Sequence, residues 1–254
     1  MKFSIITPTH QRPKELERAI NSILGQDYNN FEFIIVNDSP DFDYSELENM
    51  EILKDRRIKY FKNEKNMGVN FSRNFALDNV SEDSDYIIFL DDDDWLNEKC
   101  LSEAVKAIKE NPNYNWYVSN RADFRSNKSI TKNNTKKVEI NYLVDYLIKK
   151  RFYGDATHCI DFKKNKKTRF PVNIGKHLDE AWYYYIQIDN KFYYYDFNST
   201  FSYGSGDMTI YSKRNKKERL SNSKILFKDS IINKRLNFKL LLYFVLRYFA
   251  IVLK

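Results

Sequence analysis

The sequence predicts an α/β fold built on a mostly parallel sheet with helices on both faces. Over roughly the first 115 residues, short apolar runs alternate with segments of helical periodicity, a pattern typical of parallel strands joined by helices. The chain has 254 residues but only 6 glycines and 5 prolines, so one domain with an appendage fits better than two domains joined by a flexible linker.

Individual elements follow from periodicity and from the residues that bound them. In the first predicted helix, Leu16, Ile20 and Ile23 recur at helical spacing. Pro13 suits the first turn of that helix, where its missing N–H costs nothing. Strands are predicted at residues 3–8, 31–38, 58–63 and 86–91, and helices at residues 13–26, 68–80 and 101–111.

Polar residues follow three of the predicted strands. Pro8 and Thr9 come after the first strand, Asp38 ends the second, and residues 91–94, all aspartates, end the fourth. In open parallel sheets, ligands bind outside the carboxyl ends of the strands. We therefore expect these polar residues to meet at one edge of the sheet.

The run of aspartates at residues 91–94 requires a counter-charge. Two carboxylates about 4 Å apart repel by about 4 kcal/mol at an effective dielectric constant of about 20. A hard divalent cation such as Mn²⁺ or Mg²⁺ prefers these oxygen ligands. The alternative is a solvated loop in which Asp94 caps the following helix. The position directly after a buried strand favours the ligand site for the run, and Asp94, its last residue, is still predicted to cap the following helix.

Four stretches of the first half follow one another with a characteristic order and spacing. They read SIITPTHQRPKELERAINSILGQ, FEFIIVND, NMGVNFSRNFAL and YIIFLDDDDWL. Together they resemble the successive motifs of inverting family 2 glycosyltransferases, which have the GT-A nucleotide-sugar fold. The resemblance covers residues 1–115 and extends more weakly to about residue 210. It implies metal-dependent transfer of a sugar from a UDP-sugar to a hydroxyl of a growing glycan.

Position by position, the resemblance also implies which residues bind the donor. The donor-binding residues would be Pro8, Thr9, Arg12, Asp38, Arg73, Asp91 and Asp92. Asp38 would accept a hydrogen bond from the uracil edge, and Arg73 would lie beside the base and phosphates. Asp91 and Asp92 would lie near the ribose. Asp93 would ligate the Mn²⁺ or Mg²⁺ that bridges the diphosphate.

Two of these residues also have simpler interpretations. Asp38 could make an Asx turn before Pro40. Arg73 could be a surface arginine paired with Asp78 or another acid. Neither interpretation accounts for the complete set.

Inverting transfer requires a carboxylate that takes a proton from the acceptor hydroxyl. In the family this general base is the aspartate of a Glu-Asp pair that opens a helix, with an aromatic or apolar residue three positions on. The nearest match is GKHLDEAWYYYI, in which Asp179 precedes Trp182 by three positions and Leu178 replaces the glutamate. We predict Asp179 as the base. Glu180 is the alternative, and the pair could also simply open a helix.

The second half of the chain is aromatic and basic, and the net charge of the whole chain is +7. We interpret residues 1–215 as the GT-A domain, with a nucleotide-sugar half at 1–115 and an acceptor half at 116–215. Residues 216–254 form a basic, amphipathic helical segment. Residues 199–213 have the composition either of a lid over the donor or of a plain surface loop.

The segment at residues 234–254 combines five basic residues with a long aromatic and Leu-rich stretch. Its apolar stretch is short of the roughly 20 residues that span a bilayer, and Arg247 interrupts it. A helix lying on an anionic membrane surface fits this composition. The alternative is a helix packed on the domain or on a partner subunit. A membrane-bound acceptor, such as a lipid-linked, capsular or lipopolysaccharide glycan of a bacterium, would agree with the first interpretation.

Other sequence features bound the function further. No export signal opens the chain, so we expect a cytoplasmic protein at the inner face of the membrane. Cys100 and Cys159 lack the spacing of a metal site and are expected to be free thiols. A nucleotidyltransferase should carry a glycine-rich phosphate loop, which TPTHQRP does not provide. In a nucleic-acid-binding module, the aspartate run would repel the phosphates of the nucleic acid. We therefore expect no nucleic acid as a partner.

Overall fold

The computed structural model describes most of the chain. The described residues are 1–172, 179–189, 191–203, 216–232 and 234–252, and for residues 179–182 and 250 only the backbone is described. The strands are β1 (Phe3–Thr9), β2 (Phe31–Asn37), β3 (Ile58–Lys62), β4 (Tyr86–Phe89), β5 (Trp95–Leu96), β6 (Trp116–Asp123), β7 (Lys128–Ser129), β8 (Lys132–Asn133), β9 (Glu139–Asn141), β10 (Phe152–Tyr153), β11 (Ala156–Asp161) and β12 (Lys191–Ser202). The helices are α1 (Pro13–Leu24), α2 (Ser45–Glu48), α3 (Val69–Asp78), α4 (Cys100–Glu110), α5 (Phe162–Asn165), α6 (Asp179–Ile186), α8 (Lys216–Ile232) and α9 (Phe238–Val252), with a 3₁₀ turn η1 (Glu51–Lys54) and a π-helical segment η2 (Tyr142–Ile148).

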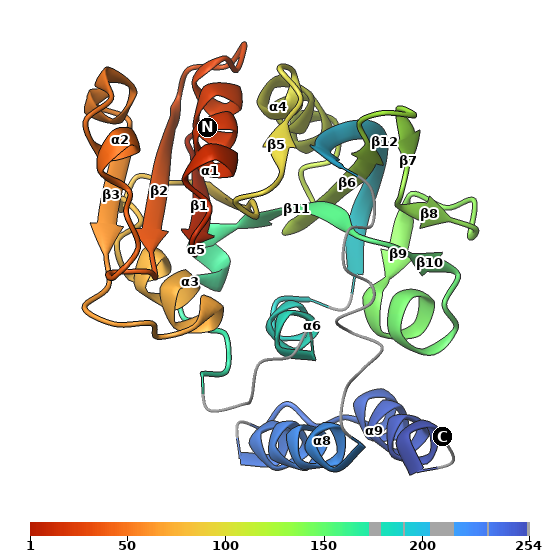
Figure 1. Ribbon diagram of the computed structural model, residues 1–254. Coiled ribbons are helices and arrows are strands. Elements are labelled where there is room, and N and C mark those ends of the chain that lie inside the picture. The colour runs from red at the N-terminus through yellow and green to blue at the C-terminus, as the bar shows by residue number, and fades with distance from the viewer. Residues whose placement is uncertain (173–178, 190, 204–215, 233, 253–254) are drawn as a thin grey trace.

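One large sheet runs through the described part of the molecule, in the order β3-β2-β1-β4-β11-β6-β12-β5 (Figure 1). Strands β3, β2, β1 and β4 are mutually parallel. β11 is antiparallel to both β4 and β6, whereas β12 is parallel to β6. The mostly parallel α/β sheet predicted from the sequence is therefore confirmed.

The four predicted strands and three predicted helices are all present, with ends shifted by at most two residues. One shift matters for the site. Pro8 marked the end of the predicted strand and Thr9 lay beyond it, but β1 includes both residues, and they pair with Val36 and Asn37 of β2. Every residue of β1 and β2 is buried, as expected for strands covered on both faces.

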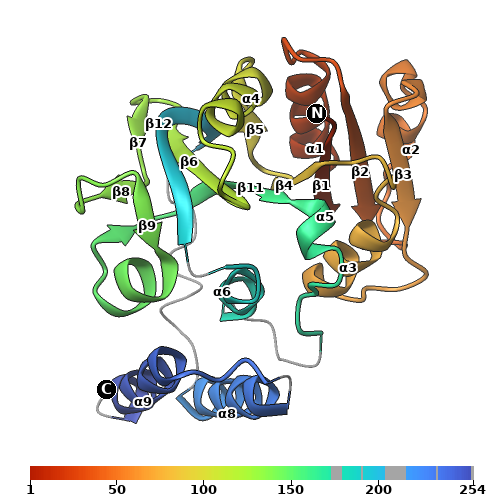
Figure 2. The same ribbon diagram turned by 180° about the vertical axis from the view of Figure 1, so that it is seen from behind.

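Two hydrophobic cores cover the two faces of the sheet, and the alternating side chains of β1 contribute to both. Phe3 and Ile5 face a core shared with α1 and α4. Ile6 faces the other core, to which α3, α6, α8 and α9 contribute. Figures 1 and 2 show α1 and α4 on one side of the sheet and α3, α6, α8 and α9 on the other.

The aromatic residues of the second half mostly fill the core. Trp116 is fully buried, stacks on Tyr185 at 5.5 Å and contacts Phe192 at 5.0 Å. His158 belongs to the same core, since Trp116 Nε1 donates to its Nδ1 at 3.1 Å and Tyr185 stacks on it at 4.2 Å. Burial lowers the pKa of His158 to about 3, which keeps this ring neutral.

The C-terminal segment forms two helices, α8 and α9, which lie side by side below α6 (Figure 2). Leu226 of α8 and Leu240, Tyr243 and Phe244 of α9 are buried in the core that includes α6. Within the described ranges, no helix is long and apolar enough to cross a membrane.

Candidate active site

The aspartate run forms a tight turn between β4 and β5. Leu90 N donates to Ile6 O at 3.0 Å, which sets the run beside the end of β1, and Asp94 N donates to Asp91 O at 3.1 Å. The prediction that Asp94 caps the following helix is wrong. Helix α4 begins six residues later at Cys100, and Asp94 instead directly precedes β5, with a side chain that is only 5% exposed.

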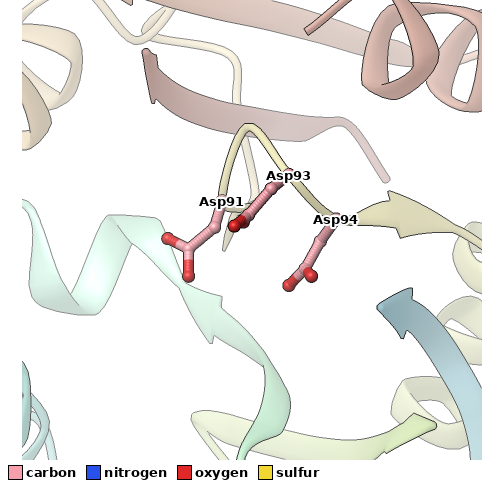
Figure 3. Close-up of side chains that lie close together, drawn as sticks. All are labelled: Asp91, Asp93 and Asp94. Atoms are coloured by element: carbon pink, nitrogen blue, oxygen red, sulfur yellow. The ribbon is translucent and has the colours of Figure 1, made fainter. Parts of the chain in front are cut away.

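Three of the four carboxylates form a compact cluster. Oxygen atoms of Asp91, Asp93 and Asp94 all lie within 4.8 Å of one another, and Figure 3 shows their side chains leaving the turn on one side. The donor set consists of hard carboxylate oxygens, which suits Mg²⁺ or Mn²⁺. The residues present therefore fit a divalent cation. The predicted ligand Asp93 belongs to the cluster, and Asp91 and Asp94 are two ligand candidates that sequence reasoning did not assign to the metal.

Arginines from three different elements supply part of the required counter-charge. The ion pairs are Arg73–Asp91 (2.9 Å), Arg12–Asp92 (3.1 Å), Arg12–Asp93 (2.8 Å) and Arg121–Asp94 (2.8 Å). Each aspartate of the run thus has an arginine partner. Because Arg12 precedes α1, Arg73 lies on α3 and Arg121 lies on β6, these pairs also fix three elements around the turn.

Asp92 is not part of the cluster and holds the end of β1. Its Oδ2 accepts from Thr9 Oγ1 at 2.9 Å and from His10 N at 3.2 Å, and its Oδ1 accepts from Arg12. Burial raises the pKa of Asp92 to about 6, and the neighbouring Arg12 opposes that rise. Thr9 is likewise buried. Asp92 and Thr9 therefore position the loop between β1 and α1.

Arg121 and Asp155 are site residues that sequence reasoning missed. Arg121 Nη1 lies 3.3 Å from Asp155, which stands just before β11, while its Nη2 contacts Asp94. Burial raises the pKa of Asp94 to about 8, the charge of Arg121 opposes the rise, and Asp91, Asp93 and Asp155 add to it. No motif marks these positions, because antiparallel pairing of β6 with β11 brings them together.

Asp38 lies at the carboxyl end of β2 and organises the loop before α3. Its carboxylate accepts from Asn63 Nδ2, Met67 N and Gly68 N, each at 2.7 Å, and the residue is 4% exposed. The Asx turn that the sequence suggested for Asp38 belongs instead to Asn37, whose Oδ1 accepts from Ser39 N at 2.9 Å.

A small cavity of about 200 Å³ opens beside Asp38. Its lining residues are His10, Gln11, Asp38, Ser39, Pro40, Asp41, Phe42 and Asn66. Whole small-molecule sites typically measure about 300–1,000 Å³. The cavity thus has the size of a subsite for one ring, at the sheet edge where the sequence predicted a nucleotide.

Arg73 is held in a defined position facing the aspartate run. Its side chain is 15% exposed, and its guanidinium carbon lies 5.2 Å from the centre of the Phe170 ring, which stacks on Tyr184 at 4.0 Å. The alternative pairing of Arg73 with Asp78 is wrong, because Asp78 pairs with Arg169.

The predicted base lies where a helix begins. Asp179 is the first residue of α6, with Glu180 in the same turn. The side chains of both residues are outside the described part of the structure, as is the segment 204–213 of the expected lid.

The match to a family model decides the classification. The model described as "Glycosyl transferase family 2" matches residues 4–166, which include the cavity, the aspartate run and Arg121. The chain belongs to this glycosyltransferase family. The nucleotidyltransferase and nucleic-acid-binding alternatives thereby lose their support.

Curated relatives agree with this family assignment. A glycosyltransferase of Haemophilus influenzae without an assigned substrate is 31% identical over 183 residues, which is 71% of this chain and 70% of the relative. A Campylobacter jejuni enzyme named "GalNAc(5)-diNAcBac-PP-undecaprenol beta-1,3-glucosyltransferase" is 40% identical over 111 residues. That match covers 43% of this chain, which spans only 35% of the Campylobacter enzyme.

Solved structures show the same GT-A fold. Residues 1–349 of TarS from S. aureus, in complex with UDP-GlcNAc, superpose with a TM-score of 0.75 at 21% identity, covering 98% of this chain and 73% of TarS 1–349. A mannosyltransferase from Pyrobaculum calidifontis, in complex with GDP-Man and Mn²⁺, gives a TM-score of 0.63 at 13% identity, covering 97% of this chain and 69% of that protein.

The raised pKa of Asp94 predicts how the affinity of the carboxylate cluster for a cation would depend on pH. A cation binds only the ionised form of Asp94. Because the pKa of Asp94 is about 8, cation binding at a lower pH must release a proton from this side chain. Affinity for Mn²⁺ should rise by up to about tenfold per pH unit between about pH 6 and pH 8, and then level off. Calorimetric titrations at several pH values measure this. Asp94→Asn should bind more weakly with a flatter pH profile, and a flat profile in the wild type would contradict the assignment.

Arg12 would compete with a cation for Asp93, because its Nη1 already donates to Asp93 Oδ2 at 2.8 Å. We predict that, in the absence of UDP, Arg12→Ala binds Mn²⁺ up to about fivefold more tightly than the wild type does. This factor corresponds to the loss of an exposed ion pair worth about 1 kcal/mol. Arg56→Ala makes the same change of charge at an exposed position away from the run and should leave Mn²⁺ affinity unchanged. Weaker Mn²⁺ binding by Arg12→Ala would show that Arg12 supports the cation site.

Proposed function

We propose that the protein transfers a sugar, with inversion, from a UDP-sugar to a hydroxyl of a growing glycan. One observation carries the proposal. The cavity beside Asp38, which has the size of a nucleobase subsite, and the carboxylate cluster both lie at the carboxyl ends of β1, β2 and β4. A UDP-GlcNAc complex of TarS and an Mn²⁺ complex of the Pyrobaculum mannosyltransferase, both of the same fold, support this choice of ligands.

The donor would extend from the cavity to the aspartate run. The uracil would lie in the cavity beside Asp38, and Arg73 would contact the base and phosphates. We assign the ribose to Asp91 rather than Asp92, because Asp91 is 48% exposed whereas Asp92 is committed to Thr9 and Arg12. Pro8 and Thr9 support the pocket from within β1, and Arg12, whose side chain is 47% exposed, borders it.

Chemically, the departing diphosphate must be neutralised and the acceptor hydroxyl deprotonated. A bound Mn²⁺ or Mg²⁺ held by Asp93, with Asp91 and Asp94 beside it, would supply Lewis-acid stabilisation of the leaving group. Arg12 and Arg73 add positively charged N–H donors on the same side. Asp179, with Glu180 as the alternative, would take the proton from the hydroxyl that attacks the anomeric carbon.

The acceptor would be a bacterial glycan on a membrane lipid or in a capsular or lipopolysaccharide precursor. The name of the Campylobacter relative, which specifies an undecaprenol-linked oligosaccharide, supports a lipid-linked acceptor. We assign residues 1–215 to catalysis and residues 216–254 to attachment at the inner face of the membrane.

The surface of α9 supports the attachment. One face of the helix is apolar and exposed, with Phe238 at 79%, Leu241 at 39%, Leu242 at 39%, Val245 at 43%, Leu246 at 47%, Tyr248 at 46% and Phe249 at 53%. Arg247, which appeared to interrupt the apolar stretch, is half-buried and donates to Tyr243 Oη at 3.0 Å on the packed side. The outward face of α9 is therefore more uniformly apolar than its sequence suggested. Exposed Lys224 and Lys228 of α8 add positive charge suited to anionic lipid.

Titration with UDP, with and without Mn²⁺, tests the function. UDP should bind and raise the melting temperature, and Mn²⁺ should increase both effects. Asp93→Ala should lose the contribution of Mn²⁺, whereas Asp83→Ala, an exposed aspartate elsewhere, should keep it. If UDP neither binds nor stabilises the wild type in either condition, the proposal fails.

The base assignment is tested by UDP release from a panel of UDP-sugars. Asp179→Asn should keep UDP affinity but lose about 100-fold or more in turnover, the usual contribution of a general base. Glu180→Gln should retain turnover. The opposite result for the two variants would transfer the role to Glu180.

Membrane attachment is tested by flotation with vesicles of phosphatidylcholine and phosphatidylglycerol. Leu242→Glu and Phe249→Glu should each weaken binding by about tenfold or more, because burial of an apolar side chain worth about 1.5–3 kcal/mol is lost. Val138→Glu places the same charge on a 55% exposed apolar residue outside α9 and should bind like the wild type. Equal flotation of all four proteins would refute the attachment through α9.

A further inference from the structure

An exposed group of aromatic side chains begins directly after the aspartate run. Phe124 and Tyr203 are each 50% exposed, and both ring centres lie 5.0 Å from the partly buried Trp95. Phe124 and Tyr203 also contact each other at 5.8 Å. We call Trp95, Phe124 and Tyr203 the aromatic platform.

Three strands build the platform. Trp95 opens β5 and pairs across the strands with Phe201 of β12. Phe124 follows β6, and its N–H donates to Ser202 O at 2.9 Å, so it lies next to Tyr203 at the end of β12. The three rings thus stand within or directly after strands of one sheet, which sets them next to one another.

Arg18 of α1 connects the aromatic platform to the carboxylate cluster of Asp91, Asp93 and Asp94. Its guanidinium carbon lies 4.3 Å from the centre of the Trp95 ring and 4.9 Å from that of Tyr203. Its Nη2 donates to Asp93 O at 2.5 Å. One arginine therefore touches both the platform and the backbone of the predicted metal ligand, and it fixes their relative position.

We infer that the aromatic platform binds a pyranose ring of the acceptor glycan. The inference rests on the proposed function and adds the place where the acceptor is held. One face of a pyranose carries C–H groups, which pack on aromatic rings, while its hydroxyls extend outward and form hydrogen bonds. Arg125, whose guanidinium lies 5.7 Å from Tyr203, provides a donor at the edge of the platform.

Other uses of this surface fit less well. The cavity proposed for uracil lies at the ends of β1 and β2, which several strands separate from β5 in the order of the sheet. A membrane would meet α9, which lies at the far end of the molecule from β5 and from the end of β12 that pairs with it (Figures 1 and 2). A purely structural cluster would bury its rings, whereas two of these three are half exposed.

Saturation-transfer NMR with defined saccharides tests the inference in the full chain, with UDP and Mn²⁺ present. The probes are cellotriose, chitotriose, maltotriose and mannotriose. We expect the wild type to bind at least one of them. Phe124→Ala and Tyr203→Ala should each weaken that binding by about fivefold or more, the loss of one aromatic contact.

Two further variants separate binding from folding. Phe124→Leu keeps an apolar side chain and should preserve the melting temperature while still losing saccharide affinity. Tyr248→Ala removes a 46% exposed tyrosine from α9 and should bind saccharide like the wild type.

The possible results distinguish this inference from the proposed function. Binding of UDP with failure of every saccharide to bind the wild type overturns the platform alone. The platform is equally wrong if Phe124→Ala and Tyr203→Ala bind saccharide as well as Tyr248→Ala does. A parallel loss of UDP-sugar affinity in both variants would assign the rings to the donor instead. Failure of UDP itself to bind would overturn the proposed function.

Discussion

The structure depends on charge compensation around one turn of the chain. A buried strand delivers four adjacent carboxylates to the edge of the sheet, and such a turn is unfavourable unless cations surround it. Arg12, Arg73 and Arg121 come from three different elements to meet it. The acidic run is therefore the candidate cation site. Its ion pairs also hold the loop before α1, the helix α3 and the strand β6 close to one another.

Local periodicity was enough to predict the first half of the fold. Strands β1 to β4 and the helices between them are encoded by nearby residues, such as the stripe of Leu16, Ile20 and Ile23 on α1. Parallel strands place their ends at one edge, so the sequence also predicted that Asp38 would lie near the aspartate run. Asp93 was assigned to the metal from a family motif, and its carboxylate lies in the compact cluster with those of Asp91 and Asp94.

Long-range antiparallel pairing explains what the sequence did not reveal. Arg121 and Asp155 are 34 residues apart and meet only because β6 and β11 pair. Arg18 looked like an ordinary helix residue, and its contacts with Trp95 and Asp93 arise from the packing of α1 against β5. The prediction of Asp94 as a helix cap failed because the two-residue strand β5 lies between Asp94 and α4. Local sequence patterns do not reveal a strand this short.

The packing of the C-terminal helices has a geometric consequence for the acceptor. Tyr183 of α6 donates to Asp229 of α8, and Arg235 donates to Gln187 O just after α6 at 3.2 Å, so the helix that begins at Asp179 is tied to the pair below it. A bilayer resting on α9 would lie roughly one helix diameter, about 10–12 Å, from α6. The two C-terminal helices would then act as a spacer that selects tethered acceptors by their height above the lipid surface.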